Sequence, residues 1–178
     1  MPTKVKGLTL IELIVTLSIA TLLSFMAAPS MLMFIEKQKV SSDLFKVRSI
    51  IETARNHAIS NNRTIRICGL EDLELEQSDI DCQRDWTKLS VFAPGKSKKL
   101  ELIHVHHLDG NYEQIQWSSF QRKPYLQLKP NGFTDHQNGT LYLCHNRHRS
   151  LHRAISISKS GRVTIHEDSK SINDNCNN

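Results

Sequence analysis

The sequence predicts an α+β fold, in which a long N-terminal α-helix packs through its second half on a C-terminal domain of antiparallel β-strands. Three observations support this fold class. Residues 8–28 form an apolar run, a helical repeat of apolar residues continues to about residue 60, and from residue 64 the apolar residues alternate. We therefore expect a helical segment over residues 8–62 and a β-rich domain over residues 63–178.

The N-terminal apolar run is long enough to cross a bilayer as a helix. Between Leu8 and Ala28 the only charged residue is Glu12, and Pro29 follows the run directly. A helix of about 20 apolar residues spans the hydrocarbon core of a membrane. Two lysines precede the run, and positive charge at this position keeps the amino end in the cytoplasm. We therefore predict a transmembrane helix over residues 8–28 and an exported C-terminal domain.

Three interpretations of this run compete. A secretory signal peptide ends in a small-residue cleavage site, and Ala27-Ala28 is a faint version of one. A plain signal anchor explains the length of the run, but it leaves Glu12 unexplained, since a carboxylate in hydrocarbon is costly and usually functional. The third interpretation accounts for both features and rests on a resemblance.

The segment Gly7-Leu8-Thr9-Leu10-Ile11-Glu12 resembles the type III signal of type IV pilins and of type II secretion pseudopilins. The resemblance implies that a prepilin peptidase cuts between Gly7 and Leu8, so that residues 1–7 are a cleaved leader. It also implies that the new amino terminus, at Leu8, is methylated. Phe is usual at this first mature position, and Leu8 departs from the pattern.

The resemblance gives Glu12 a role in assembly. In a filament, the Glu12 carboxylate is expected to pair with the free amine at Leu8 of a neighbouring subunit. This contact would provide a partner for a charge that otherwise lies unpaired in lipid or among packed helices. The alternative is a glutamate near the headgroups that reaches water. Pro29 removes a backbone donor and either kinks the helix or marks the membrane exit.

Helical periodicity resumes after the proline. Apolar residues at spacings of four and three form one stripe, which is expected to pack on the β domain: Val40, Leu44, Val47, Ile51, Ala54 and Ala58. Charged residues lie mostly off this stripe: Lys39, Asp43, Lys46, Arg48, Glu52 and Arg55. Asn61-Asn62 provides a stop signal.

The remainder alternates with the period of β-strands. Strands are predicted at 64–68, 88–92, 100–106, 114–117, 125–128, 140–144, 154–158 and 162–166. Asn138-Gly139 and Ser160-Gly161, each at short spacing between apolar runs, are predicted to be hairpin turns. The polar end, from Ser171 to Asn178, is expected to be loose unless Cys176 ties it down.

The detailed resemblance is to the GspH/FimT branch of minor pilins and pseudopilins, and it covers most of the chain except residues 69–123. It is carried by four stretches: Ala54-Arg55-Asn56-His57-Ala58-Ile59 before Thr64-Ile65-Arg66-Ile67-Cys68, Asn131-Gly132-Phe133, Gly139-Thr140-Leu141-Tyr142-Leu143-Cys144, and Ala154-Ile155-Ser156-Ile157-Ser158 before Gly161-Arg162-Val163. The resemblance implies a pilin-like fold, in which a half-transmembrane helix carries a β-sheet head.

Four cysteines in an exported chain indicate disulfides, and three pairings are open. We favour Cys68 with Cys82 and Cys144 with Cys176, the pairs nearest in sequence. Free buried thiols are the alternative. A zinc site is not indicated, because the sequence contains no Cys-x-x-Cys pair and the predicted helix contains no His-x-x-x-His pair.

Charge is unevenly distributed along the domain. Seven acidic residues lie between Glu71 and Asp85, relieved only by Arg84. Calcium binding and a solvated acidic loop are both open, although the alternating ligands and glycine of a calcium loop are missing. Loss of the two leader lysines would lower the formal net charge from +5 to +3, which is weak evidence for a polyanionic partner.

A basic strip lies between residues 144 and 166, and it contains no acid. Its candidate DNA-binding residues are Arg147, Arg149, Arg153, Lys159 and Arg162. Some FimT-like pilins bind DNA for natural transformation through a Gly-Arg-x-Arg motif. Here Gly161-Arg162-Val163-Thr164 keeps the first Arg and has Thr164 in place of the second. Double-stranded DNA is therefore one hypothesis, and a solvated basic face is the other.

No enzymatic pattern stands out, and we expect no catalytic residue, metal or cofactor. The sequence lacks a Gly-rich phosphate loop, a serine nucleophile elbow and a paired-carboxylate pattern. His104 and His106 alternate onto one face of a predicted strand, so a metal clip and a plain exposed face are both open.

Together these features predict a FimT/FimU-like minor type IV pilin, located in the inner membrane with a periplasmic head and in the cell-surface pilus after assembly. Its partners would be other pilins, the prepilin peptidase and the membrane, with DNA as a further hypothesis. The alternative is a GspH-like pseudopilin of type II secretion. A membrane-anchored periplasmic binding protein is a more distant interpretation.

Overall fold

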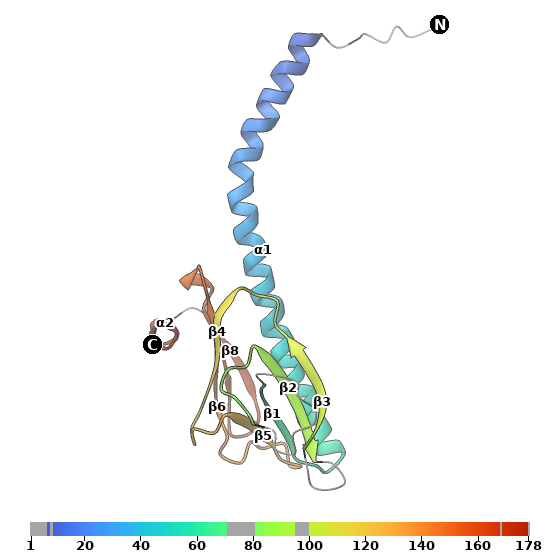
Figure 1. The fold of residues 1–178 in the computed structure, drawn as a ribbon, viewed down its shortest axis with the longest axis vertical. Helices are drawn as coiled ribbons and strands as arrows, with labels where there is room; N and C mark the ends of the chain where they lie inside the picture. Colours follow the sequence, from blue (N-terminus) through green and yellow to red (C-terminus); the bar gives the residue numbers. More distant parts are fainter. Residues whose placement is uncertain (1–6, 8, 71–80, 95–99, 168, 178) are drawn as a thin grey trace, which may run out of the picture. The chain divides into compact units, whose positions relative to one another are not determined.

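The structure is a computed structural model that describes residues 7, 9–70, 81–94, 100–167 and 169–177, with the backbone alone for residues 26–29. The chain divides into two compact units, Met1–Gln38 and Lys39–Asn178. Helix α1, Leu10–Ser60, runs through the boundary, so its second half belongs to the β-rich unit. We call this unit, Lys39–Asn178, the head (Figure 1).

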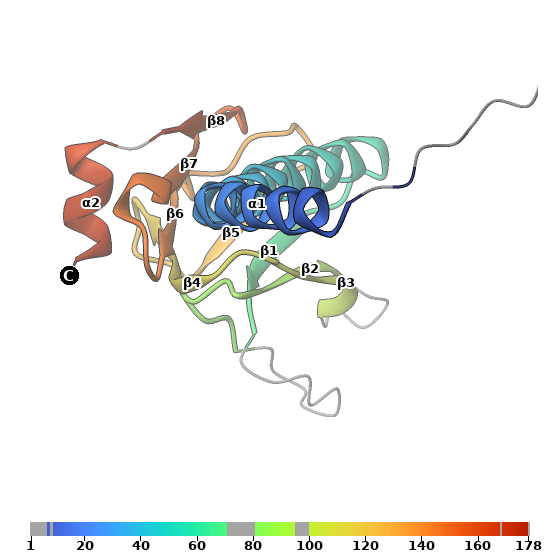
Figure 2. The ribbon, with the colours of Figure 1, turned by 90° about the horizontal axis from the view of Figure 1, so that it is seen from above.

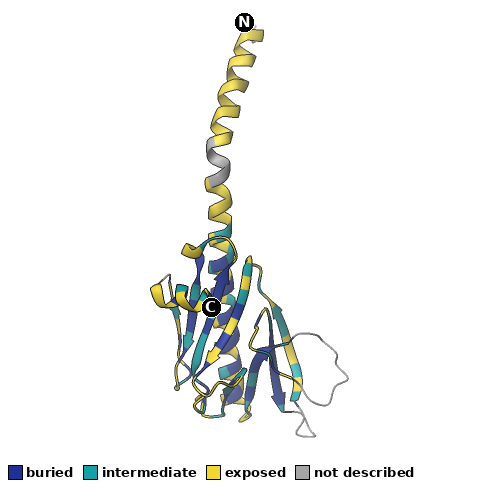
Figure 3. Ribbon diagram, turned by 60° about the vertical axis from the view of Figure 1, so that its left-hand side comes forward, coloured by how far each residue is buried: buried dark blue, intermediate teal, exposed yellow. Residues whose placement is uncertain are grey.

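The first unit exposes its apolar side chains. Between Leu10 and Ile35 every described side chain is exposed, as Figure 3 shows. Among the described residues no single helix combines the length and hydropathy of a membrane span. Leu10–Phe25 and Ser30–Ser60 taken together have the length and composition of a bent membrane span.

The first sheet of the head has the strand order β3-β2-β1-β5, and each neighbouring pair is antiparallel. Ile67 marks its register, because it pairs with Val91 on one side and with Leu126 on the other. The bounds of these strands are β1 Ile65–Gly69, β2 Lys88–Pro94, β3 Leu100–His107 and β5 Tyr125–Leu128.

The second sheet has the order β4-β6-β7-β8 and is also antiparallel. A 3₁₀ helix, η1, lies between β6 and β7, and a short helix, α2, follows β8 on the sheet face away from α1 (Figure 2). The bounds are β4 Tyr112–Ser119, β6 Gly139–His145, η1 Arg149–Leu151, β7 Arg153–Ile157, β8 Val163–His166 and α2 Lys170–Cys176.

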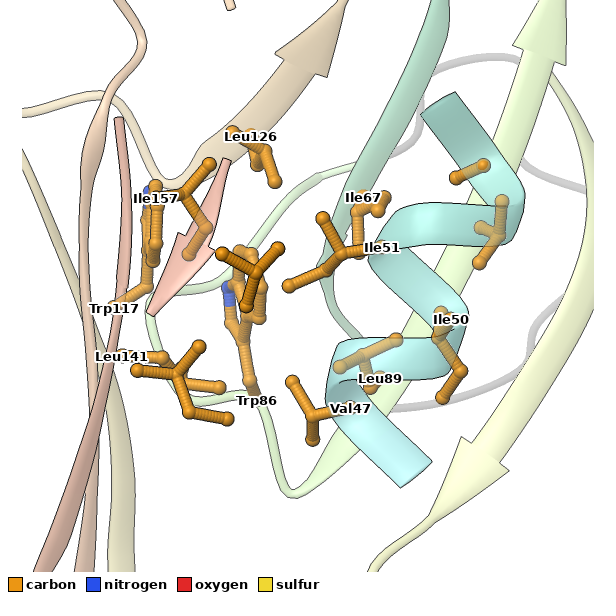
Figure 4. Close-up of a cluster of buried hydrophobic side chains, with 14 of the residues drawn as sticks. Val47, Ile50, Ile51, Ile67, Trp86, Leu89, Trp117, Leu126, Leu141 and Ile157 are labelled. Carbon is orange, nitrogen blue, oxygen red and sulfur yellow. The ribbon is translucent and has the colours of Figure 1, made fainter. Parts of the chain in front are cut away.

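One hydrophobic core joins the head part of α1 to both sheets. The predicted helical stripe is buried in full and packs on inward side chains of the strands. Trp86 and Trp117 stack at the centre, with ring centroids 4.7 Å apart (Figure 4). The backbone amide of Trp86 donates to the Ile115 carbonyl over 2.8 Å, which ties the segment before β2 to β4. Burial of two large aromatic side chains contributes strongly to stability.

All eight predicted strands are present within the described residues, with ends shifted by no more than two positions. Ser160-Gly161 turns the β7–β8 hairpin as predicted, and Gly161 adopts φ +76°. The hairpin prediction at Asn138-Gly139 is wrong. The preceding strand, β5, pairs with β1 in the first sheet, so this connection carries the chain between sheets.

The C-terminal tail is helical rather than loose. Ser169 caps α2 by accepting a hydrogen bond from the Ile172 amide over 3.4 Å, and Ile172 is buried. A disulfide joins Cys176, the last residue of α2, to Cys144 of β6. The tail is therefore docked by a cap, one apolar contact and a covalent bond.

Candidate functional site

The N-terminal signal contains a feature that the sequence analysis missed. The Thr9 amide donates to Glu12 Oε2 over 3.5 Å, and the Glu12 amide donates to Thr9 Oγ1 over 3.3 Å. This reciprocal pair is a capping box, which satisfies two backbone donors at the start of a helix. The Thr-x-x-Glu spacing is its sequence signature and could have revealed it. Leu8 and residues 1–6 lie outside the described residues.

The capping box places the Glu12 carboxylate at the first turn of α1 while leaving it exposed. A negative charge there is favoured by the positive end of the helix dipole. The same carboxylate is thus oriented by its own helix and accessible to a cation outside it.

Two disulfides tie the head together, with the pairing that we favoured from the sequence. Cys68 joins Cys82, and Cys144 joins Cys176. The first bond closes the segment that contains the acidic run, of which residues 71–80 lie outside the described part of the chain. The second bond holds α2 on the outer face of the second sheet.

The five candidate DNA-binding residues do not form one cluster. The β6–β7 connection carries Arg147 and Arg149, and its Asn146 amide donates to the Asn111 carbonyl, which lies beside Asp109 and Gly110. We call this part of the head the Asp43 end, because Asp43 binds that same loop. The turn at the other end of β7 carries Lys159 and Arg162, and we call this part the Arg55 end.

A β-strand advances about 3.3 Å per residue, so the five residues of β7 separate these two groups by roughly 17 Å. A DNA duplex could bridge that distance, but no compact basic site unites the five side chains. The strip that the sequence suggested is two separate groups.

At the Asp43 end, Arg147 and Arg149 are exposed, whereas Arg153 is half-buried and engaged. Arg153 Nη1 donates to the carbonyls of Ser150 and His152, over 2.9 and 2.8 Å. Arg153 therefore holds the connection in place. The two exposed arginines are the ones available to a partner.

At the Arg55 end, one helical arginine organises two turns. Arg55 Nε donates to the Gly132 carbonyl over 3.0 Å. A Cβ added at Gly161 would lie 2.5 Å from that carbonyl oxygen and 2.9 Å from Arg55 Nε, so this position admits only glycine. Three of the stretches that carry the family resemblance, at the helix end and at both turns, converge here.

The convergence leaves an open cleft of about 460 Å³ between α1 and the β7–β8 turn. Its charged and polar lining comprises Arg48, Glu52, Arg55, Asn56, Ser160 and Arg162. Arg162 and Lys159 are exposed, as is Thr164 on β8, where the second arginine of the Gly-Arg-x-Arg motif would stand.

Asp43, predicted to lie off the packed stripe, is fully buried. Its carboxylate accepts hydrogen bonds from the amides of Asp109 and Gly110, the latter over 2.7 Å, and from the Tyr112 hydroxyl over 3.1 Å. Lys46 Nζ lies 3.9 Å from it and 2.7 Å from Asp109 Oδ2. The carboxylate thus fixes the loop that joins the two sheets to α1.

The Asp43 end also perturbs neighbouring pKa values. Burial, followed by the Asp43 carboxylate, raises the pKa of Tyr112 far above its ordinary range. The hydrogen bond and charge of Lys46 lower the pKa of Asp109. Burial, then His104 and Lys46, lower the pKa of His106.

His104 and His106 lie on one face of β3 as expected, with ring centroids 5.8 Å apart. Within the described part of the chain, no group of three or more His, Cys, Asp or Glu side chains could hold a metal ion.

A helix that starts in a methylation-type signal and continues into a head of two antiparallel sheets defines the class of pilin-like proteins. Residues 2–28 match the prokaryotic N-terminal methylation motif. Residues 46–161 match the family described as Type II transport protein GspH. The chain belongs to this GspH family of minor pilins and pseudopilins, whose members are structural proteins without enzymatic activity.

Solved structures support the fold. The head resembles the type IV minor pilin FimU of Pseudomonas aeruginosa PAO1 in two crystal forms, with TM-scores of 0.57 and 0.52 and identities of 23% and 22%. The match covers 77% and 73% of this chain, and 95% and 94% of FimU. No curated protein matches the sequence. The motif implies processing by prepilin peptidase, anchoring in the inner membrane and assembly with other pilins.

Proposed function

We propose that this chain is a minor type IV pilin, cut between Gly7 and Leu8, methylated at Leu8 and incorporated in or at the tip of the pilus. The observation that carries the proposal is the combination of the methylation motif at residues 2–28 with a head that resembles FimU over 95% of that chain. In this proposal residues 1–7 are the leader, residues 8–62 the assembly helix and residues 63–178 the periplasmic β-rich domain.

Glu12 is the assembly residue of this proposal. The capping box orients its carboxylate while leaving it exposed, so it can pair with the methylated amine of a neighbouring subunit. Glu12→Gln is the informative variant, since glutamine preserves a capping box but removes the charge. We expect normal processing of this variant and a strong loss from assembled filaments, with Thr9→Ser as a control that retains both.

Mass spectrometry of the membrane-extracted protein tests the processing step. We expect a mature chain that begins at N-methylated Leu8, and a Gly7→Val variant that keeps its leader. An intact Met1 in the wild-type protein would overturn the proposal.

A type II secretion pseudopilin is the second candidate, and the description of the matching family favours it. The two candidates differ in phenotype. Deletion of the gene removes surface pili and twitching if the chain is a pilin, whereas it leaves pili intact and blocks protein secretion if the chain is a pseudopilin.

DNA capture for natural transformation is an additional part of the proposal, supported by the exposed arginines and lysine at the two ends of β7. Phosphate contacts make DNA affinity fall steeply with salt, by about one unit of logarithmic slope per contact. We expect Arg147→Glu with Arg149→Glu, and separately Lys159→Glu, to weaken binding of double-stranded DNA by the full-length protein in detergent. Thr164→Arg, which completes the Gly-Arg-x-Arg pattern, should strengthen it. Affinity that is negligible, or insensitive to these changes, would remove DNA from the function.

A further inference from the structure

The cleft at the Arg55 end has an imbalance of charge. It is lined by three arginines, Arg48, Arg55 and Arg162, and by one acid, Glu52. Arg48 Nε and Glu52 Oε1 form an ion pair at 2.8 Å. The other two guanidinium groups therefore face the cleft without a carboxylate from its lining.

These two arginines differ in how firmly they are held. Arg55 is half-buried and fixed by its Nε bond to Gly132, which leaves its terminal nitrogens for other acceptors. Arg162 is exposed and, among the described residues, its guanidinium has no hydrogen-bond or ion-pair partner. Two guanidinium groups at one cleft repel each other unless an anion lies between them, and a planar fork suits a carboxylate or a phosphate.

The size and lining of the cleft favour a carboxylate side chain over a nucleic acid. A volume of about 460 Å³ admits one or two side chains but not a duplex. Glu52 within the lining would also repel a continuous run of phosphates. A single carboxylate suits the two arginines that have no carboxylate partner in the lining, Arg55 and Arg162.

We propose that this cleft receives an aspartate or glutamate side chain from a neighbouring pilin subunit, with Arg55 and Arg162 as its two partners. The inference rests on the proposed function, since it requires assembly with other pilins. Four residues of the lining, Arg48, Glu52, Arg55 and Asn56, lie on α1, the helix whose N-terminal signal marks the chain for assembly. A contact here would therefore fix the orientation of one head relative to the next.

Zero-length crosslinking in assembled filaments tests this contact directly. A water-soluble carbodiimide joins a lysine amine to a carboxylate only when the two form an ion pair. In the Arg162→Lys variant we expect an isopeptide bond between residue 162 and an Asp or Glu of another pilin chain, identified by mass spectrometry. Thr164→Lys is the matched control, because it places a lysine on the same hairpin outside the cleft, and it should form no such link.

A link only to Glu52 of the same chain would show that the cleft satisfies itself, and it would overturn the proposal. The absence of any link from residue 162 in filaments that contain the variant would overturn it as well.

Charge reversal gives a second readout. Arg162→Glu should lower the amount of chain recovered in filaments by about tenfold, because it sets like charges against each other. Lys159→Glu, on the same turn but outside the cleft, should change recovery by less than about twofold. Intrinsic fluorescence of the buried Trp86–Trp117 pair verifies that both variants are folded.

A larger loss of DNA binding in Arg162→Glu than in Lys159→Glu, with normal filament recovery, would assign the cleft to a DNA surface and overturn the proposal. Failure here is distinguishable from failure of the proposed function. A processed, methylated chain that assembles normally despite Arg162→Glu refutes the cleft alone, whereas an unprocessed chain refutes the pilin assignment.

Discussion

Asp43 and Arg55 lie on the same helix, and each holds the backbone of a distant loop. Asp43 accepts hydrogen bonds from its loop, whereas Arg55 donates one. Asp43 is fully buried, and its carboxylate accepts from two amides and one hydroxyl. Arg55 is half-buried and donates one bond to Gly132, with its remaining donors near an open cleft. The Asp43 carboxylate is therefore engaged within the head. Arg55 also holds a loop of the head, but its remaining N–H donors can bind a further group.

The difference follows from the chemistry of the two groups. A carboxylate has two oxygens, and a turn that presents consecutive amides can satisfy both in a space too small for water. A guanidinium has five N–H groups, more than one carbonyl can accept. We therefore infer that the Asp43 end mainly stabilises the head and that the Arg55 end is the one suited to bind.

Removal of Asp43 should have the largest effect on stability. Asp43→Ala leaves two amides and a half-buried hydroxyl without their acceptor, and Lys46 loses a partner. We expect a loss of about 3 kcal/mol in the free energy of unfolding, because several donors to one charged acceptor lose it together. Asp43→Asn, which keeps one acceptor, should lose about 2 kcal/mol. Urea unfolding followed by tryptophan fluorescence measures both losses. Equal stability of Asp43→Ala and the wild-type protein would contradict the inference that the Asp43 end stabilises the head.

Removal of Arg55 should have a smaller effect. Arg55→Met retains the aliphatic packing but leaves the Gly132 carbonyl without its donor, at a cost of about 1.5 kcal/mol. The cleft loses one of its two unpaired cations in the same step. Filament recovery should therefore fall by more than the stability loss explains. A stability-matched variant elsewhere in the core, Ile67→Val on β1, provides the control, since it costs a similar amount and its strand neighbours, Val91 and Leu126, do not line the cleft.

The Arg48–Glu52 pair should contribute little to folding. Both side chains are about half exposed, at 47% and 50%, and an i,i+4 pair of this kind is worth about 0.3–0.5 kcal/mol. Glu52→Gln should nevertheless strengthen capture of an external carboxylate, because it frees Arg48. A matched pair of measurements, unfolding by urea and yield of the residue-162 crosslink, separates the two effects. A large loss of stability would show that Glu52 is a structural residue of the head.

Local patterns in the sequence were sufficient to predict most of the fold. A stripe at helical spacing and eight alternating runs each reflect one face that must be buried, so helix and strands could be placed without knowledge of their partners. Whether the two strands that flank Asn138-Gly139 pair with each other could not be predicted in this way. A turn signal reports local backbone geometry, but the sheet that receives the next strand depends on contacts far along the chain.

Only those parts of the candidate site that lie within one contiguous stretch of the sequence could be predicted. Gly7 and Glu12 belong to one contiguous signal, whereas the division of the basic strip into two groups depends on the direction of β7. Asp43 was placed off the packed face because it is charged, and only the distant amides at Asp109 and Gly110 make its burial favourable. Arg55 and the cleft were missed for the same reason, since their partners lie far away in the sequence.

The smallest predicted effect is on pKa values at the Asp43 end. Lys46 supplies the two largest causes that lower the pKa of Asp109, but only the third for His106, after burial and His104. Lys46→Met should therefore raise the pKa of Asp109 clearly and that of His106 slightly, in NMR titrations of the full chain in micelles. Asp135, at the Arg55 end, has its pKa lowered chiefly by Lys129 and should not change.

The titrations of Asp109 and His106 affect the stability of the head over different pH ranges. Because the pKa of Asp109 is lower in the folded protein, its pairing with Lys46 stabilises the head above the unfolded value of 3.8 and is lost as the pH falls through the lowered value. The lowered pKa of His106 means that the head loses stability as the pH falls below 6.5, since the unfolded chain takes up that proton first. Lys46→Met should weaken the first dependence strongly and the second only slightly. Equal changes in both would mean that Lys46, rather than burial, controls the titration of His106.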